Sequence, residues 1–324
     1  MSPTYYSSIA HTFQYFSVTY SNRLFNHFPM TITSLEELGA STVQLQCYND
    51  YYCERLVSCE TEVDDENNEL AGLEQHQAFY LAQLNELGIK KTLEAELPSL
   101  INGIGAGNFY ALNRLASGIK QENSQEIAMS LALWKTLHLD LGELGDDCLK
   151  RPTSLLRHVS KKIGNIRFSA GNTTDRMNSV ITLVDYQQTP HQPQFIDFIT
   201  LANATATIYK MSGDFTMLHS VTACWSLKTI LPYLDDETTA LRYFWQATLV
   251  AYLSAGSPAM TFVDKISLSP WPQLIDFCSQ SNNEHLIDLC YACHHLFQDT
   301  ELEIYHQIAS RYVAIYTEPA PGIA

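Results

Sequence analysis

The sequence predicts an all-α protein. Apolar residues recur at three- and four-residue spacing along most of the 324-residue chain. The alternation of apolar and polar residues that a half-buried strand needs is almost absent, and no segment repeats at a fixed interval. With 46% hydrophobic residues the chain can bury a large core, and no change of composition marks a linker. We therefore expect a single helical domain over residues 1–324, with a ligand pocket in its helical core.

The N-terminal third carries several helix signals. Pro29 can open a short helix, and Ser41 with Gln44 forms a capping box for the next one. Residues 60–69 are acidic and nearly free of large apolar side chains, which indicates a solvated segment without a function of its own. From residue 75 to residue 100 the pattern is helical again.

The middle of the chain contains one capped helix and one irregular stretch. Asn123 with Glu126 caps a helix whose buried stripe includes Ile127 and Trp134. Residues 162–194 combine glycine, proline and many Ser, Thr and Asn residues. This composition predicts a long loop with room for one short helix.

Residues 213–258 predict two consecutive helices. Pro232 ends the first helix because proline has no N–H to donate. Asp235 or Asp236 can cap the second helix, and Gly256 supplies its C-terminal stop. The other predicted elements can be placed relative to this pair of helices.

Charge and composition exclude several classes of function. With 19 Lys and Arg against 35 Asp and Glu the net charge is −16, which repels nucleic acid and anionic membranes. Small neutral or aromatic substrates suit such a chain better. The N-terminus lacks a basic region followed by an apolar run, and the eight cysteines follow no disulfide framework. We expect a soluble, cytoplasmic protein with reduced thiols.

Two motifs resemble cofactor signatures without their context. Residues 290–294 match the haem attachment pattern C-x-x-C-H, but the chain shows no export signal and both cysteines continue a helical apolar stripe. Zinc at these cysteines with His294 and His295 would need a second ligand pair at a defined spacing. The glycines of residues 103–107 suggest a dinucleotide loop, but Asn108 stands where the third glycine belongs. We expect these glycines to allow a close approach of helices or a ligand.

Several motifs in a fixed order carry a resemblance to a known family. The run TMLHSVTACWSLKTILPYLDD, followed by ALRYFWQ and AYLSAGSP, resembles the questin oxidase-like family. Four further landmarks of that family follow in the expected order, namely NHFPM at Asn26–Met30, LEELGAS at Leu35–Ser41, GNFYALNRLA at Gly107–Ala116 and NNEHLIDLCYAC at Asn282–Cys293. The resemblance spans most of the chain.

The resemblance implies a redox function. Members similar to fungal questin oxidases open aromatic quinone rings by inserting oxygen. At least some use a non-haem iron held by histidines and a carboxylated lysine, and NADPH is associated with the reaction. His27, His219 and His285 fall at histidines of the family pattern. A lone histidine on an apolar helix is more often a hydrogen-bonded core residue, so the resemblance is what makes His219 a candidate ligand.

Asp288 adds a carboxylate to this set. It lies three residues after His285, so both side chains project from one face of a helix. Imidazole with carboxylate suits non-haem iron, and helical proteins assemble such sites from distant parts of the chain. The residues themselves therefore allow the metal site that the resemblance implies.

Three positions depart from the family pattern. Tyr110 replaces a histidine, Asp288 replaces the lysine, and Trp225 replaces a later histidine. Phenolate and carboxylate are both oxygen donors for iron, so we expect Tyr110 and Asp288 to act in catalysis, with Asp288 also a ligand.

We expect an oxygenase acting on an aromatic quinone-like compound in a pocket lined by Phe109, Arg114 and Trp225. The alternative is an inactive relative that binds a small molecule or a protein. In that case Tyr110 pairs with Arg114 or Asn113, and Trp225 packs in the core.

Overall fold

The structure is a computed structural model that describes residues 19–20, 24–57, 72–164, 166, 168, 171–261 and 267–317. Nearly all regular structure in these residues is helical, which confirms the all-α class. The contacts divide the chain into two compact units, which we describe one at a time: Met1–Asn68 with Lys265–Ala324, and Glu69–Asp264. The single-domain organisation stays a prediction. The acidic segment 60–69 lies outside the described residues.

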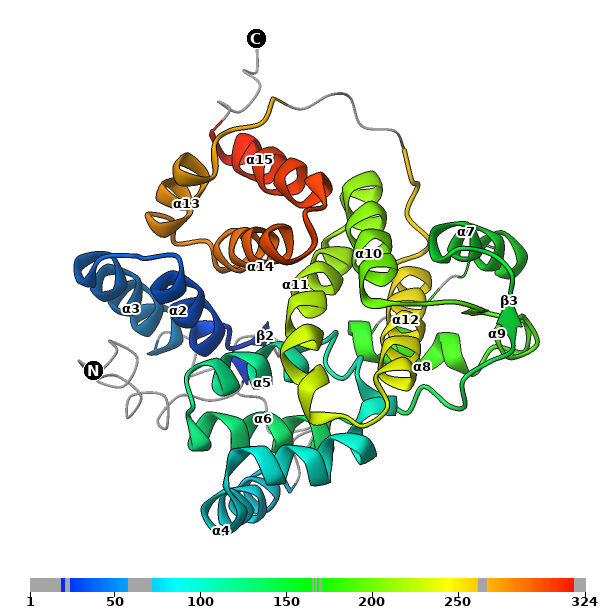
Figure 1. The fold of residues 1–324 in the computed structure, drawn as a ribbon, viewed down its shortest axis with the longest axis horizontal. Coiled ribbons are helices and arrows are strands. Elements are labelled where there is room, and N and C mark those ends of the chain that lie inside the picture. Colours follow the sequence, from blue (N-terminus) through cyan, green and yellow to red (C-terminus); the bar gives the residue numbers. More distant parts are fainter. Residues whose placement is uncertain are drawn as a thin grey trace. The chain divides into compact units, whose positions relative to one another are not determined.

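The first unit combines the two ends of the chain (Figure 1). Its elements are β1 (Thr19–Tyr20), β2 (Leu24–Phe25), α2 (Phe28–Glu37), α3 (Thr42–Val57), α13 (Trp271–Ser279), α14 (Glu284–Thr300) and α15 (Glu303–Thr317). Helix α14 packs against α2, α13 and α15, so it is the central element of this unit. The two short strands pair antiparallel just before α2.

Local signals of the sequence set the helix ends in this unit. Proline occupies the first turn of α2, and Ser41 and Gln44 exchange the two hydrogen bonds of the predicted capping box before α3. Asn283 caps α14 by accepting from the Leu286 N–H. A 3.2 Å ion pair between Arg55 of α3 and the buried Glu284 then ties α14 to α3.

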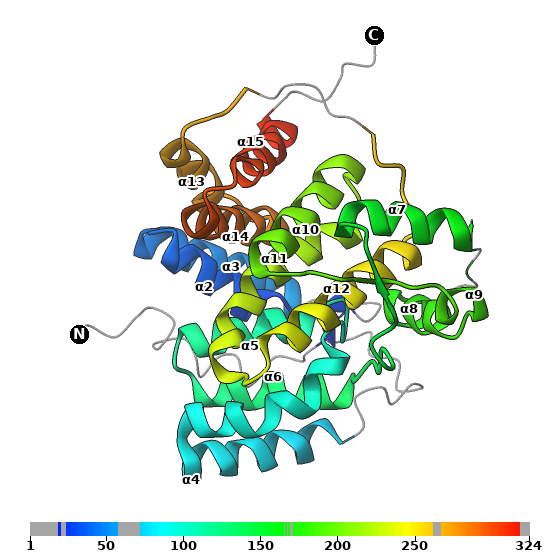
Figure 2. The same ribbon diagram turned by 45° about the vertical axis from the view of Figure 1, so that its right-hand side comes forward.

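The second unit is a series of helices packed face to face. Its elements are α4 (Leu73–Leu100), η3 (Ile101–Gly103), α5 (Tyr110–Lys120), α6 (Ser124–Thr136), β3 (Asp147–Cys148), α7 (Pro152–Ile163), α8 (Thr173–Ile181), α9 (Val184–Gln187), β4 (Gln192–Pro193), α10 (Phe198–Ser212), α11 (Phe215–Ile230), η4 (Leu231–Tyr233) and α12 (Glu237–Ser254). Contacts run in succession from α4 through α6, α5 and α11 to α10, with α12 against α8, α10 and α11 (Figure 2). Strands β3 and β4 pair in parallel.

The predicted helix pair at 213–258 is confirmed as α11 and α12. Helix α11 ends at Ile230, just before Pro232, and a short 3₁₀ turn follows. Asp236 caps α12 by accepting a 3.0 Å hydrogen bond from the Thr239 N–H. The predicted cap by Asn123 is also present, because its side chain accepts from the Gln125 and Glu126 N–H groups.

The prediction for residues 162–194 needs a correction. The stretch holds two helices, α8 and α9, rather than one. Helix α8 begins with a full capping box, in which the Asn172 side chain accepts from the Asp175 N–H and the Asp175 carboxylate accepts from the Asn172 N–H. The density of polar residues masked this local helix signal.

The glycines of residues 103–107 let side chains from other parts of the unit approach the backbone closely. A Cβ atom at Gly103 would lie 2.5 Å from the His138 ring, which is far inside contact distance. At Gly105 it would lie 3.0 Å from Met177 of α8. The indole of Trp134 donates a 3.0 Å hydrogen bond to the Gly103 carbonyl. The close approach predicted for these glycines is therefore made by side chains of the same unit, those of His138 and Met177.

A buried ion pair joins α5 to α6. The guanidinium of Arg114 donates to both carboxylate oxygens of Glu126, and both side chains are almost fully buried. The same guanidinium donates to the Tyr110 hydroxyl at 3.0 Å. This confirms the pairing of Tyr110 with Arg114 that the sequence offered as one alternative, and it commits the Glu126 side chain to Arg114. No described helix is both long enough and apolar enough to cross a membrane.

The cap at Asp236 should contribute measurably to stability. Hydrogen bonds from the Thr239 N–H and hydroxyl hold the pKa of Asp236 below its ordinary value. The stabilisation that the ionised Asp236 cap gives is therefore complete above the unfolded-state pKa of aspartate, about 3.9. It is lost as the pH falls through the lower pKa that Asp236 has in the folded protein. We expect Asp236→Ala to lower the free energy of unfolding by about 1 kcal/mol at about pH 7 in urea titrations, and by less at about pH 3. Asp235→Ala is the matched control, and equal losses in both variants would contradict the cap.

The Arg114 pair should behave as a structural element. Arg114→Met leaves the Glu126 carboxylate buried without a cation, so we expect a loss of about 3–5 kcal/mol in the free energy of unfolding. The double variant Arg114→Met/Glu126→Leu removes both charges and should recover most of that loss. Urea unfolding followed by circular dichroism measures both, with the exposed Arg157→Met as control. A single variant as stable as wild type would show that the pair is dispensable.

Candidate functional site

The first candidate residue, His27, lies at the start of α2. It is the N-cap residue, and its carbonyl accepts from the Met30 and Thr31 N–H groups and from the Thr31 hydroxyl. Its own N–H donates a 3.0 Å hydrogen bond to the hydroxyl of the fully buried Tyr52 of α3. The backbone of His27 is thus fixed from two helices, while its side chain is 16% exposed.

Asp288 faces the same end of α2 from α14. The Ser34 hydroxyl donates to one carboxylate oxygen at 2.8 Å, and the Thr31 hydroxyl donates to the other at 3.1 Å. The second oxygen lies 3.9 Å from Nδ1 of His27, an ion-pair distance that is too long for a direct hydrogen bond. Burial raises the pKa of the Asp288 carboxyl above its ordinary value, and its imidazole and hydroxyl neighbours offset part of that rise.

His285 completes this group, which we call the α2/α14 cluster: His27, Thr31, Ser34, His285 and Asp288. The His27 and His285 rings lie with centroids 4.9 Å apart and are tilted by 51°. Within the first unit, two imidazoles and one carboxylate predicted as ligands therefore lie together.

The α2/α14 cluster fits non-haem iron in donor type but is not closed around one point. Two histidines and a carboxylate are the donor set of many non-haem iron sites. Ligands that share one metal at about 2.1 Å have donor atoms about 3 Å apart, so the 3.9 Å from His27 to Asp288 would have to shorten by about 1 Å. Among the described residues, no three His, Cys, Asp or Glu side chains are placed to hold a metal ion.

His219 belongs to the second unit and lies on α11. Its half-buried ring makes an edge-to-face contact with Phe215 at 5.1 Å, and its carbonyl accepts a hydrogen bond from the Thr222 hydroxyl. Thr222 in turn accepts from the side chain of Asn113 on α5. His219 belongs to a different unit from the α2/α14 cluster, and its role as a ligand stays a prediction.

The predicted pocket residues of the second unit have their own contacts. Phe109 is fully buried against Phe244, with ring centroids 5.3 Å apart. Arg114 is engaged by Glu126 and Tyr110, and Trp225 is half-buried on α11. Their assignment to a substrate pocket, and the catalytic role of Tyr110, stay predictions.

A left-handed turn precedes α5 in the landmark GNFYALNRLA. Gly107, Asn108 and Phe109 have φ angles of 59°, 56° and 68° in succession. Glycine and asparagine accept this conformation, but for a bulky phenylalanine it is unfavourable by about 1–2 kcal/mol. Strain of this kind persists only where the surroundings enforce it, and it is frequent at functional sites.

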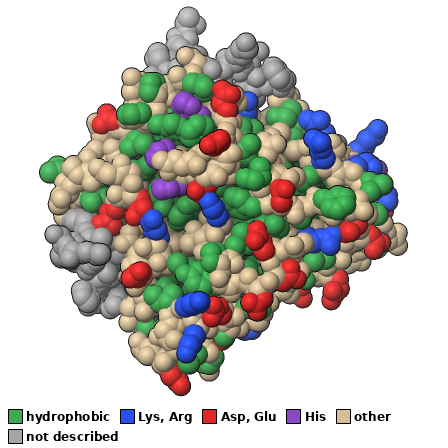
Figure 3. Space-filling model, in the orientation of Figure 1, with side chains coloured by type: hydrophobic (Ala, Val, Ile, Leu, Met, Phe, Trp, Pro, Cys, Tyr) green, Lys and Arg blue, Asp and Glu red, His purple; other side chains and the backbone are tan. Residues whose placement is uncertain are grey.

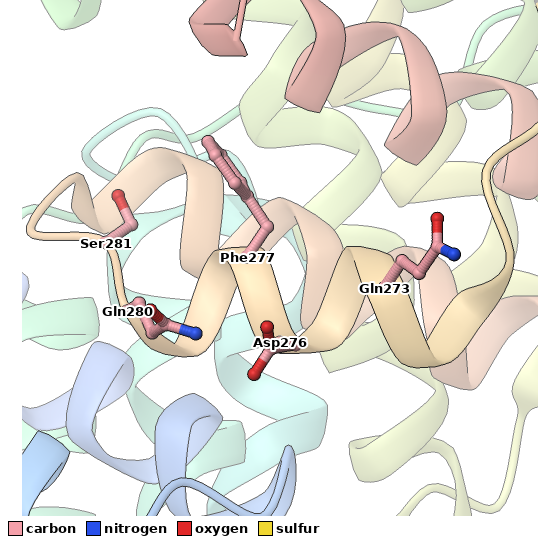
Figure 4. Close-up of a pocket in the computed structure, with 5 residues that line it drawn as sticks. All are labelled: Gln273, Asp276, Phe277, Gln280 and Ser281. Atoms are coloured by element: carbon pink, nitrogen blue, oxygen red, sulfur yellow. The ribbon is translucent and has the colours of Figure 1, made fainter.

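One surface pocket of about 400 Å³ lies on α13 (Figure 4). It is lined by Gln273, Asp276, Phe277, Gln280 and Ser281. None of these residues was predicted to bind substrate, and all five come from α13 and the residues that directly follow it. The pocket in the helical core stays a prediction.

The sequence interpretation missed the residues that hold the cluster together. Thr31 and Ser34 follow His27 by four and seven residues, which places all three on one helical face. That spacing was a usable signal. Tyr52 gave none, because its hydroxyl reaches the His27 N–H only through the packing of α3 on α2.

Comparisons with known proteins agree with this arrangement of motifs. A search of curated proteins found no matching relative. Residues 24–293 match the family described as questin oxidase-like, a span that includes His27, Tyr110, His219, His285 and Asp288. The chain therefore belongs to the questin oxidase-like family.

Proposed function

We propose that this protein is an oxidoreductase that binds a non-haem iron at the α2/α14 cluster. The observation that carries the proposal is the meeting of His27, His285 and Asp288 in one unit of a questin oxidase-like chain. Asp288 supplies the anionic donor where the family pattern has a lysine. A neutral tyrosine or amide there would leave both positive charges of Fe(II) uncompensated.

The residues of the cluster have distinct tasks in this proposal. The Ser34 and Thr31 hydroxyls orient the carboxylate, and the Tyr52 hydroxyl fixes the His27 backbone. The His27 and Asp288 side chains keep 16% and 14% of their surface exposed, which leaves a route for a small ligand. Iron bound by such a donor set supplies oxygen chemistry at its open positions.

The substrate class of the proposal rests on the family. We propose an aromatic, quinone-like compound as substrate and NADPH as the source of reducing equivalents. The negative charge of the chain, −16, is compatible with a neutral ring system. Edge and face contacts with aromatic side chains would hold such a ring.

A second candidate function is that of an inactive relative acting as a binding module. Two observations favour it. The Asp288 carboxylate already accepts two hydroxyl hydrogen bonds, and Tyr110 is engaged by Arg114. Both residues that replace family ligands thus have structural partners, as expected if they neutralise a former site.

Iron content separates the two functions. We expect wild-type protein reconstituted with Fe(II) without oxygen to hold about one iron per chain, and Asp288→Ala to bind iron about 10–100-fold more weakly. Glu284→Gln is the matched control, because it alters another buried carboxylate of α14 that pairs with Arg55. It should lower stability and leave iron content unchanged.

The thermal unfolding of the same proteins gives an independent readout. A metal that binds only the folded state raises the melting temperature of wild type and Glu284→Gln when iron is added, and not that of Asp288→Ala. Equal and near-zero iron in wild type and Asp288→Ala, with no thermal shift in either, would overturn the iron site and leave the binding module.

A further inference from the structure

The basic residues of this acidic chain are concentrated in one segment. Residues 148–174 contain six of the 19 Lys and Arg residues and none of the 35 Asp and Glu residues. This segment therefore carries six positive charges, while the whole chain carries a net charge of −16. A local excess of this size marks a surface with its own electrostatic preference.

Helix α7 carries three of these charges on one side. Its buried face consists of Pro152, Leu155, Leu156 and Val159. The opposite face is exposed and carries Arg157, His158, Lys161 and Lys162. In Figure 3, Lys and Arg side chains gather at the place that α7 occupies in Figure 1.

Two exposed apolar side chains lie beside the start of this helix. Leu149 is 87% exposed and Phe195 is 81% exposed. Leu149 directly follows strand β3, and Phe195 lies two residues after the paired strand β4, where the Gln194 N–H donates to the Cys148 carbonyl at 3.0 Å. Strand β4 also packs against α7. We call Leu149, Lys150, Arg151, Arg157, Lys161, Lys162 and Phe195 the α7 surface.

The charges of the α7 surface are not neutralised within the described part of the chain. None of its five basic side chains forms an ion pair with a described residue. The carboxylates nearest along the chain are used elsewhere, since Asp147 pairs with Arg242 and Asp175 belongs to the capping box of α8. The surface therefore presents free positive charge next to apolar anchors.

We propose that the α7 surface binds an acidic segment of a partner protein that also presents apolar side chains. A short acidic segment contacts only this surface, and at physiological ionic strength charges beyond about 8 Å are screened. It therefore meets the local positive charge rather than the net charge of −16.

An anionic membrane fits the α7 surface less well. A membrane is an extended plane that also faces the acidic remainder of the chain, and the apolar side of α7 is buried and cannot insert. Leu149 and Phe195 suit the pockets of a protein partner, where exposed aromatic and aliphatic side chains act as anchors.

The test is direct binding of a labelled peptide to the full-length protein. The probe is a fluorescein-labelled peptide of about twelve residues, rich in Glu and Asp, with one Phe and one Leu. Fluorescence anisotropy should show binding that weakens several-fold as salt rises from about 50 to about 300 mM. Net repulsion between two acidic molecules predicts the opposite trend with salt, so the sign of the salt effect reports local attraction.

Charge reversal on α7 should remove this binding. We expect Lys161→Glu/Lys162→Glu to weaken peptide binding by about tenfold or more. The matched control is Lys90→Glu/Lys91→Glu, which makes the same change of charge on exposed lysines of α4 and should weaken binding less than about twofold. The milder pair Leu149→Ser/Phe195→Ser, which leaves the charge unchanged, should weaken binding about fivefold.

The controls decide between the alternatives. Circular dichroism melting of each variant checks folding, and Lys161→Gln/Lys162→Gln replaces the reversal if that variant unfolds early. Binding lost equally in the α4 and α7 variants, no peptide binding by wild type, or binding only to vesicles with about 30% anionic lipid would each overturn the proposal.

Discussion

A carboxylate withdrawn from water must find compensation inside the protein, and Glu126 of the second unit and Asp288 of the first find it in different ways. In the second unit, Glu126 is compensated completely, because the guanidinium of Arg114 bonds both of its oxygens and joins α5 to α6. In the first unit, Asp288 accepts from two neutral hydroxyl groups and lies 3.9 Å from the His27 imidazole. The two solutions have different chemical meanings. The carboxylate of Glu126 is structural, whereas the proposed iron would complete the charge compensation of Asp288.

Helix α14 combines packing and chemistry on different faces. Cys290 and Cys293 are buried, and so is Cys278 of the neighbouring helix α13. Burial raises the pKa of the Cys293 thiol, which keeps it protonated and unreactive. The C-x-x-C spacing therefore follows from helical packing. The N-terminal part of the same helix presents His285 and Asp288 toward α2, so the position of the candidate site depends on how well the cysteine face packs.

Much of the fold could be predicted because its signals are local. Pro232, Asp236, Asn123 and the pair Ser41–Gln44 act within one helical turn, and each does so in the structure. The meeting of His27 with Asp288 could be suggested only through family motifs, since the residues are 261 positions apart. The ion pair between Glu126 and Arg114 could not be predicted, because the spacing of Asn123 and Glu126 also matches a capping box.

The left-handed turn before α5 constrains the order in which this region can fold. Gly107 and Asn108 can adopt positive φ angles in an unfolded chain. For Phe109 a positive φ angle is unfavourable until its ring packs on Phe244 of α12. Helix α5 begins at the next residue. Its first turn is therefore tied to a contact with a helix more than a hundred residues later, and non-local contacts of this kind form late and slowly. A segment that carries Tyr110 thus acquires its shape together with the core of its unit.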